Sequence, residues 1–185
     1  MEKETRCPWC LSDPLLRDYH DRRWGRPEHG DRELFAQLVL ECFSVGLSWR
    51  LILHKEEALR RACGGLDPEI CALYGPEKEE ELLRTPGIIH HRGKIRSIGE
   101  NAKAFLEVRK EWGSFDAYLW HWTEGKPVVR TPETLDDIPA EDELSRKVSR
   151  DMKKRGFRYL GPVTVYSYMQ GVGLINDHLL SCPYK

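Results

Sequence analysis

One stretch organises the chain: Glu41-Cys42-Phe43-Ser44-Val45-Gly46-Leu47-Ser48-Trp49. It closes a run that begins at Asp31 and whose apolar residues recur at helical spacing. Four residues share one face of this expected helix: Leu34, Leu38, Glu41 and Val45. Three of the four are apolar and the remaining one is a carboxylate, so the buried face of the helix carries an acid.

The position of Glu41 needs an explanation, because burying a carboxylate without a partner costs several kcal/mol or more. Either Glu41 faces a cavity that receives a ligand, or a cationic side chain neutralises it. The helix breaks at Gly46 and a new one starts at Ser48, which leaves Trp49 beside the break. A carboxylate and an aromatic face on two sides of such a corner can hold a flat polar ring. The alternative is a buried Glu–Arg pair next to a core tryptophan.

The composition indicates a globular protein. A length of 185 residues suits one domain or two small lobes, and 40% hydrophobic residues with six Trp, seven Tyr and five Phe are enough for a core. No run approaches the roughly 18–20 apolar residues that a membrane helix needs. The segment 1–7 lacks the apolar region of a secretory signal. We therefore expect a cytoplasmic protein without membrane contact.

The net charge of −1 does not by itself indicate a nucleic-acid partner. Basic residues nevertheless cluster in two places, His90–Arg96 and Lys153–Arg158. Such local patches can hold phosphates even on a neutral protein. The alternative is that both runs are ordinary solvated helix ends.

The six cysteines fall into two groups. Disulfides are a poor explanation for them in a reducing compartment. Cys42, Cys63 and Cys71 lie in apolar, helix-like surroundings and are expected to be small buried hydrophobes. The other three, Cys7, Cys10 and Cys182, lie far from that group near the two ends of the sequence.

A metal site is predicted from residues at the two ends. Cys7 and His20 lie near one end, and His178 and Cys182 lie near the other at a spacing that places them on one face of a helix or turn. Two Cys and two His match the preference of a closed, structural zinc site. Cys10 completes a CxxC with Cys7 and could replace a histidine, or it could be a spare thiol.

The pattern predicts an all-α protein of about eight helices. We expect them over about 31–45 and 48–62, as a short helix that starts at Asp67-Pro68, over about 77–84, from near Arg92 onward, and over about 114–122, 141–155 and 161–173. Asp31, Asp67 and Ser114 are the expected N-caps of three of them. Residues 7–30 are predicted as loop and residues 123–139 as an extended connection, so sheet should be minor.

The segment Thr85–Lys94 connects two of these helices and resembles the turn of a helix–hairpin–helix. Free backbone N–H groups at the start of the second helix favour an anion, and Arg92 and Lys94 add positive charge. Such a module grips a DNA backbone phosphate without reading sequence. Ile89 stands where the hairpin usually has a second glycine. An ordinary interhelical turn is the alternative.

Taken together, ordered matches over essentially the whole chain resemble the DNA-3-methyladenine glycosylase I family of the helix–hairpin–helix superfamily. The matching positions are Cys7-x-Trp9, Asp13-Pro14, Tyr19-His20-Asp21, Trp24-Gly25-x-Pro27, Leu34-Phe35, Glu41, Gly46-Leu47-Ser48-Trp49, Gly87-Ile88-Ile89, His91-Arg92-Gly93-Lys94-Ile95, Lys154-Arg155-Gly156-Phe157, Tyr166, Met169-Gln170 and Asn176-Asp177-His178.

The resemblance implies one glycosylase domain over residues 1–185. In it two helical lobes enclose a base pocket and a DNA-binding groove, and a structural zinc site joins the termini. The zinc ligands it implies are Cys7, His20, His178 and Cys182, which leaves Cys10 outside the set.

The resemblance also assigns roles in the pocket and at the DNA. Glu41 would contact the excised base as the catalytic residue, and four aromatic residues would line or flank the pocket: Tyr19, Trp49, Trp9 and Trp24. Residues at the wedge and hairpin would contact DNA: Leu47, Gly87, Ile88, Arg92 and Lys94. Phe43, Ser44 and Leu16 depart from the family pattern at the pocket rim.

The implied activity is excision of 3-methyladenine from alkylated double-stranded DNA by hydrolysis of the N-glycosidic bond, which leaves an abasic site. The damaged base has to leave the stack first. It is cationic in DNA, so aromatic faces attract it and Glu41 can accept from its amino group. We expect no dedicated catalytic aspartate, because Asp116 suits the first turn of a helix instead.

The sequence leaves two other functions open. The departures Phe43, Ser44 and Leu16 would suit a DNA-binding protein with the same fold and no excision activity. A zinc hydrolase would need an open coordination position, and four protein ligands argue against it. The simplest assembly is a monomer with no obligate protein partner.

Overall fold

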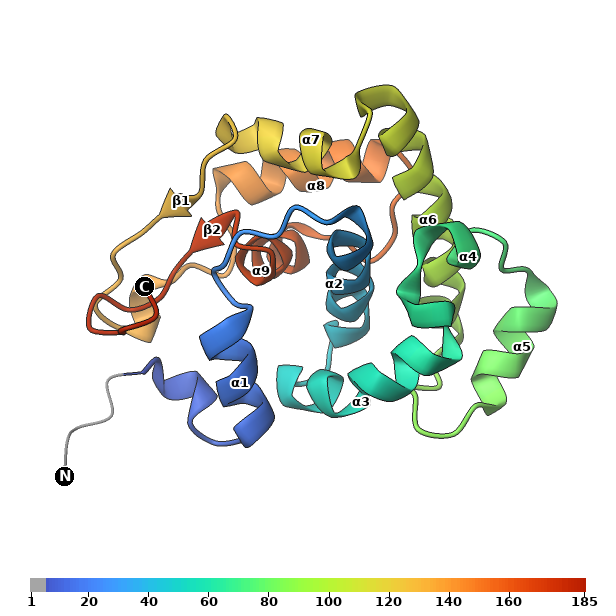
Figure 1. Cartoon of the computed structure of the whole chain (residues 1–185), viewed down its shortest axis with the longest axis horizontal. Coiled ribbons are helices and arrows are strands. Elements are labelled where there is room, and N and C mark those ends of the chain that lie inside the picture. The colour runs from blue at the N-terminus through green and yellow to red at the C-terminus, as the bar shows by residue number, and fades with distance from the viewer. Residues whose placement is uncertain (1–5) are drawn as a thin grey trace.

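The computed structural model describes residues 6–185, and within this range the chain forms nine α helices. Helix α2 (Asp31–Ser44) runs through the middle of the molecule (Figure 1). It contacts four other helices: α3 (Trp49–Ala62), α6 (Arg92–Trp112), α7 (Phe115–Trp120) and α9 (Pro162–Gly171). The all-α fold class predicted from the sequence is therefore confirmed.

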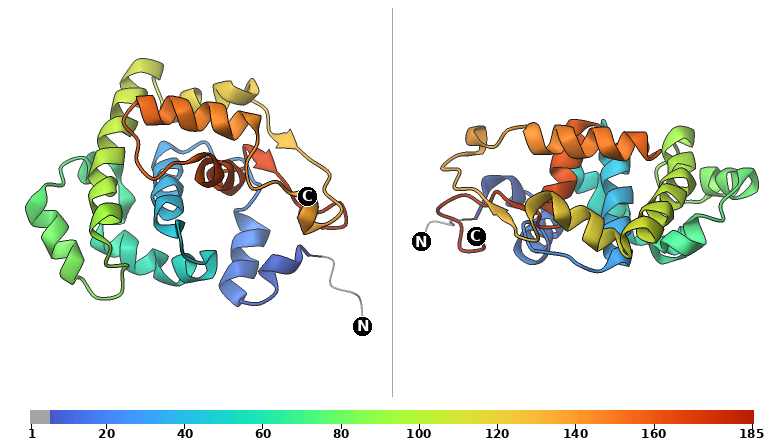
Figure 2. Two further views of the ribbon diagram at one scale, coloured as in Figure 1. Left: turned by 180° about the vertical axis from the view of Figure 1, so that it is seen from behind. Right: turned by 90° about the horizontal axis from the view of Figure 1, so that it is seen from above.

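The remaining helices lie around this centre, as the views from behind and from above show (Figure 2). They are α1 (Pro14–Arg22), α4 (Pro68–Cys71), α5 (Pro76–Arg84) and α8 (Glu143–Lys154). Short 3₁₀ turns cover Pro8–Cys10, Gly64–Leu66, His121–Thr123 and Leu135–Asp137. In residues 6–185 the sheet is limited to two parallel two-residue strands, β1 (Val128–Val129) and β2 (Ile175–Asn176), with Val128 opposite Ile175.

Two of the three predicted N-caps are confirmed. The side chain of Asp67 accepts from the Glu69 N–H of α4, and Ser114 accepts from the Ala117 N–H of α7. The prediction for Asp31 was wrong, because Gly30 is the N-cap of α2.

Asp31 has a different role. Its carboxylate accepts from the backbone N–H groups of Phe115 and Asp116, at 3.1 and 2.9 Å. It thus satisfies free donors at the start of α7, a neighbour in space that local sequence does not indicate.

The prediction of a loop over residues 7–30 was also wrong, because α1 lies within it. Asp13 caps this helix by accepting from the Leu15 N–H, and Pro14 occupies its first turn. Asp13-Pro14 is the same start signal as the Asp67-Pro68 pair that was recognised at α4. The turn formers on either side of α1 concealed it.

Val45 is a further correction, since it does not lie on the buried stripe of α2. The helix ends at Ser44, and Val45 has left helical geometry with 40% of its surface exposed. Leu34, Leu38 and Glu41 are buried as the spacing predicted. Helical periodicity applies only as far as the helix continues.

The core consists of two clusters. The larger one surrounds α2 and contains Cys42, Cys63 and Cys71, which are buried as predicted. The smaller one contains Tyr19, Trp24 and the end cysteines. Trp49 and Ile138 pack against both clusters, so the boundary between the two lies at these side chains.

No helix in residues 6–185 is long and apolar enough to cross a bilayer.

Candidate functional site

A cavity of about 450 Å³ lies where the two hydrophobic clusters meet. This volume falls within the range of about 300–1,000 Å³ that is common for small-molecule sites. The cavity is lined by Trp9, Tyr19, Trp24, Glu41, Ser44, Leu47, Trp49, Leu135, Ile138, Ser167 and Gln170. The structure thus gathers around one space all five residues that the sequence analysis assigned to a base pocket.

Glu41 lies on α2, is only 3% exposed and has no ion pair within residues 6–185. Its Oε1 accepts from the Gln37 Nε2 at 2.9 Å, one helical turn earlier. The nearby guanidinium of Arg23 donates to Gln37 and to Glu56 rather than to Glu41. The buried Glu–Arg pair, which was the alternative explanation for this acid, is not what the structure contains.

Burial raises the pKa of Glu41 to about 8, although the hydrogen bond from Gln37, the nearby Ser44 hydroxyl and the positive charge of Arg23 act in the opposite direction. Removing a carboxylate from water disfavours its charged form. A cation in the cavity would favour the charged form again. The site is therefore suited to a ligand that carries positive charge and hydrogen-bond donors.

Aromatic rings form one wall of the cavity. The rings of Tyr19 and Trp49 are 5.2 Å apart between centroids, and those of Trp9 and Trp24 are 5.1 Å apart in an edge-to-face arrangement. The Trp49 Nε1 is buried and has no hydrogen-bond partner among residues 6–185. Such a wall binds a flat ring, and its faces attract a cation.

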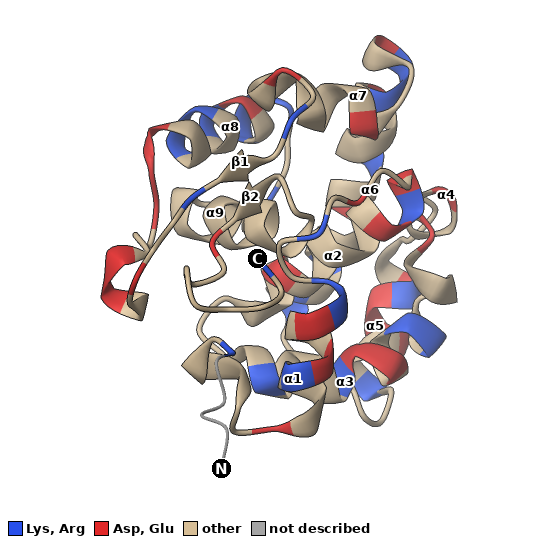
Figure 3. Cartoon of the chain, turned by 60° about the vertical axis from the view of Figure 1, so that its left-hand side comes forward, with Lys and Arg blue, Asp and Glu red and all other residues tan. Residues whose placement is uncertain are grey.

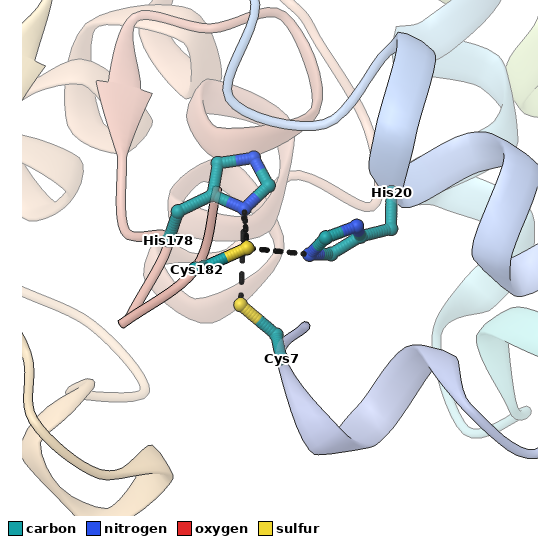
Figure 4. Close-up of side chains that lie close together, drawn as sticks. All are labelled: Cys7, His20, His178 and Cys182. Atoms are coloured by element: carbon teal, nitrogen blue, oxygen red, sulfur yellow. Dashed lines mark hydrogen bonds between the residues drawn. The ribbon is translucent and has the colours of Figure 1, made fainter. Parts of the chain in front are cut away.

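Behind this wall lies a buried group of four side chains that could hold a metal ion (Figure 4): Cys7, His20, His178 and Cys182. Their donor atoms all lie within 4.8 Å of one another. The Cys182 Sγ is 3.5 Å from both the His20 Nε2 and the His178 Nδ1, and the Cys7 Sγ is 3.7 Å from the His178 Nδ1. A tetrahedral zinc with bonds of about 2.0–2.3 Å needs donors about 3.3–3.8 Å apart.

The second nitrogen of each histidine has a fixed partner outside the group. The His20 Nδ1 lies 2.7 Å from the Asp21 Oδ1, and the His178 Nε2 lies 3.0 Å from the carbonyl oxygen of Trp24. Both partners accept, so each histidine presents a lone pair to the centre of the group. The residues therefore fit a zinc ion.

Burial raises the pKa of the Cys7 thiol to about 12 and lowers the pKa of His178 to about 4. The histidine is therefore neutral at pH 7, as a ligand must be, and a bound cation would favour the thiolate that burial disfavours. Cys10 is buried nearby but is not a member of the group.

The predicted hairpin connects α5 and α6. Gly87 has φ +89°, a conformation that favours glycine, and Ile88 is 5% exposed. His91 is the N-cap of α6 and accepts from the Lys94 N–H. The turn geometry thus follows from Gly87 and His91.

The two cations of the hairpin differ in their surroundings. Arg92 is half-exposed and forms an ion pair with Glu80 of α5. Lys94 is 5% exposed, and its Nζ donates to the carbonyl oxygens of Phe43 (2.9 Å) and Val45. Lys94 therefore holds the end of α2 and the start of the next loop, and its ammonium is not displayed at the surface.

The two basic patches are partly neutralised. Arg155 forms ion pairs with Asp151 and Glu111, and Arg96 forms one with Glu79. Figure 3 shows acidic and basic residues interleaved on α1, α3 and α5. Much of the two runs consists of paired side chains at helix ends.

Leu47 lies on the loop between α2 and α3, is 39% exposed and lines the cavity. Gly46 before it has φ +75°, a backbone conformation that side chains rarely adopt. The exposed leucine at a glycine turn is thus presented beside the cavity.

The residues that depart from the family pattern take ordinary positions. Phe43 and Leu16 are buried at 1% and 6% exposure. Ser44 lines the cavity, and its hydroxyl donates to the backbone carbonyl of Glu41. Asp116 lies in the first turn of α7 and contacts His29 at 2.7 Å, outside the cavity lining.

Sequence reasoning missed several cavity residues. Ser167, Gln170, Leu135 and Ile138 line the cavity from α9 and from the long connection before α8, and no local pattern indicates them. Gln37 was also missed. Its position four residues before Glu41 on the same helix was a usable signal, because such residues are neighbours on the helix surface.

Comparison with known proteins gives one consistent result. The family model described as "Methyladenine glycosylase" matches residues 9–185. A DNA-3-methyladenine glycosylase of Haemophilus influenzae is 38% identical over 181 residues, covering 98% of both chains. DNA-3-methyladenine glycosylase 1 of Escherichia coli is 40% identical over 177 residues, covering 96% of this chain and 95% of that one.

A solved structure has the same fold. It is the 3-methyladenine DNA glycosylase I of Staphylococcus aureus, described as showing the structural basis of 3-methyladenine recognition. It superposes with a TM-score of 0.94 at 37% identity and covers 98% of this chain and 96% of its own.

Proposed function

The chain belongs to the methyladenine glycosylase family, and from this premise we propose that it excises 3-methyladenine from alkylated DNA. The reaction hydrolyses the N-glycosidic bond and leaves an abasic site. The observation that carries the proposal is a buried carboxylate, Glu41, without an ion pair within residues 6–185 and in a cavity walled by aromatic rings.

The cavity suits the damaged base. Once flipped out of the duplex, a 3-methylated adenine in DNA presents a flat cationic ring to Tyr19 and Trp49, which attract it through their faces. Glu41 accepts from its exocyclic amino group, and a bond to an ionised carboxylate is stronger than a neutral one. Trp9 and Trp24 complete the aromatic wall.

Glu41 is the catalytic residue of the proposal. It is the one carboxylate among the residues that line the cavity in the described part of the chain. The cationic base already leaves readily, so the site needs to hold it and favour its departure more than it needs to activate a nucleophile. This agrees with the position of Asp116 on the outside, paired with His29.

We assign the DNA contacts to the wedge and the hairpin. Leu47 would enter the duplex beside the flipped base, and the backbone at Gly87 and Ile88 would approach a phosphate. Arg92 can reach a phosphate by leaving Glu80, since an exposed pair of this kind is weak. We do not carry Lys94 forward as a contact, because its ammonium serves the end of α2.

Zinc, held by Cys7, His20, His178 and Cys182, would supply a structural cross-link and no reactive position, because four protein donors complete its shell. These four residues do not line the cavity, which opposes the zinc hydrolase alternative. All six cysteines are free, in keeping with a cytoplasmic enzyme, and we place it there as a monomer.

Base release decides between this proposal and a DNA-binding protein without excision activity. The protein is incubated with methylated duplex DNA, and the free bases are separated by chromatography. We expect free 3-methyladenine and a matching number of abasic sites, with no release from untreated duplex. Binding of the methylated duplex without any released base would overturn the proposal.

A further inference from the structure

Glu41 is held by a chain of buried polar side chains that reaches away from the cavity. The Arg23 guanidinium donates through Nη1 to the Glu56 Oε2 at 2.8 Å and through Nη2 to the Gln37 Oε1 at 3.1 Å. Gln37 in turn donates through Nε2 to the Glu41 Oε1 at 2.9 Å and to the Tyr19 hydroxyl at 3.3 Å.

Arg23 fixes which end of the Gln37 amide faces the cavity side. A guanidinium can only donate, so the atom beside it has to be the carbonyl oxygen. The amide nitrogen is then turned toward Glu41 and Tyr19. Gln37, Glu41 and Tyr19 are all at most 4% exposed, so a reversed amide would leave buried groups without partners.

The amide nitrogen of Gln37 sets the roles of both cavity residues. One oxygen of Glu41 is occupied, and the other remains to accept from a ligand. The Tyr19 oxygen accepts from Gln37, so its own hydrogen is left to donate, and no acceptor within residues 6–185 takes it. The polar edge of the cavity therefore presents a donor beside an acceptor.

A donor beside an acceptor at the cavity edge is complementary to adenine and not to guanine. Adenine offers an amino donor next to the acceptor N7, whereas guanine offers two acceptors, O6 and N7, along the same edge. We propose that Gln37, oriented by Arg23, is a specificity-determining positioning residue that makes the cavity select methylated adenine over methylated guanine. This inference rests on the proposed function and adds the origin of its base preference.

The packing around Gln37 keeps this amide in place. Gly171 of α9 lies so close that a Cβ there would be 2.5 Å from the Gln37 Nε2 and 2.9 Å from the Tyr19 hydroxyl. The absence of a side chain at Gly171 leaves room for the amide and the hydroxyl to meet. Packing therefore restricts rotation of the Gln37 amide, in addition to the orientation that the hydrogen bond from Arg23 imposes.

The test measures base preference by binding, so that it does not depend on excision. Affinities for free 3-methyladenine and free 3-methylguanine are determined from quenching of the tryptophan fluorescence. Gln37→Glu places an acceptor beside Tyr19, which then donates to residue 37 and no longer to the ligand. Arg23→Met releases the amide from its partner. Each variant should lower the ratio of the two affinities about tenfold or more.

Arg60→Met is the matched control. Arg60 also pairs with Glu56, at 2.9 Å, but does not contact Gln37 within the described structure. It should leave the affinity ratio at the wild-type value. Gln37→Met, which removes the donor without adding charge, gives a second measurement if Gln37→Glu fails to fold.

An unchanged ratio in folded Arg23→Met and Gln37→Met would overturn the inference, and so would an equal fall in Arg60→Met. These results are separate from the proposed function. Failure of the wild type to release methyladenine from DNA would overturn that function, whereas the affinity ratio would still report on Gln37.

Discussion

The cavity and the group of four potential metal ligands lie on two sides of an aromatic wall, but the two regions differ in whether their polar atoms already have partners. In the group of Cys7, His20, His178 and Cys182, every donor atom faces the other donors. The outer nitrogen of each histidine is also occupied, by Asp21 or by the Trp24 carbonyl. In the cavity, by contrast, Glu41 has an amide for a partner and no cation within residues 6–185.

The difference separates a site that holds the fold from a site that awaits a ligand. A closed set of four ligands leaves no position for a substrate. Burial raises the pKa of Glu41 to about 8, so a cationic ligand that enters the cavity would stabilise the ionised form of this carboxylate. Trp24 belongs to both regions, because its ring lines the cavity while its carbonyl oxygen contacts His178.

Replacing one of the four side chains proposed to hold zinc should have the largest effect on stability. We expect Cys182→Ser to lose bound zinc and about 4 kcal/mol or more of unfolding free energy, because four donors become three. Metal content and chemical denaturation measure this. Cys10→Ser, which alters a buried cysteine outside the group, should keep its metal. Full metal content in Cys182→Ser would contradict the structural role of the group.

Removing the cavity charge should affect activity and spare stability. Glu41→Gln is expected to lower excision of 3-methyladenine about 10²–10³-fold, the range seen when one group that stabilises a reacting centre is lost. Its melting temperature and zinc content should equal or exceed those of the wild type, because a buried carboxylate has been removed. Release of methyladenine at the wild-type rate would show that Glu41 has no catalytic role.

A smaller effect on the metal site is expected from a change at Asp21, which contacts the outer nitrogen of His20. Asp21→Asn leaves all four ligands but weakens the acceptor for the His20 Nδ1, and we expect zinc affinity to fall about 10–100-fold. Competition with a chromogenic chelator measures it. Asp18→Asn, on the exposed side of the same helix, serves as the control and should leave the affinity unchanged.

The smallest effect is a pH dependence of stability that belongs to the cavity alone. The pKa of Glu41 rises from 4.5 in the unfolded chain to about 8 in the folded protein, so the folded state holds the proton more tightly. The associated stability is complete below pH 4.5 and is lost as the pH rises through 8.

Between pH 4.5 and about 8 the wild type should therefore lose stability relative to Glu41→Gln, by at most about 1.4 kcal/mol per pH unit. Denaturation in zinc-containing buffer at several pH values measures the difference between the two proteins. A constant difference would mean that Glu41 is already ionised in the empty cavity.

Features that depend on neighbouring residues could be predicted from the sequence, and features that depend on the folded chain could not. The caps Asp67 and Ser114 act within one helical turn, so residue type and position were sufficient to predict them. The acid on the stripe of α2 marked the cavity for the same reason. Lys94, in contrast, turns inward to carbonyl groups about fifty residues earlier in the chain, and only the packed structure could show that.

The same limit applies to Asp31 and to the cavity residues of α9. Asp31 looked like a cap of its own helix but caps α7 instead, because both positions offer free N–H groups and only tertiary structure decides between them. Gln170 and Ser167 come from a helix far along the sequence, and their contact with the α2 region has no local signature.

The group of four potential metal ligands also has a consequence for the order of folding. The Cys182 Sγ and the His20 Nε2 are 162 positions apart in sequence, so they meet only after the intervening helices have come together. Closing so long a loop in an unstructured chain carries a large entropy cost. Zinc would thus be captured late, by a nearly complete native topology, whereas a small zinc finger folds around its ion. Occupancy of this group would then report the integrity of the whole molecule.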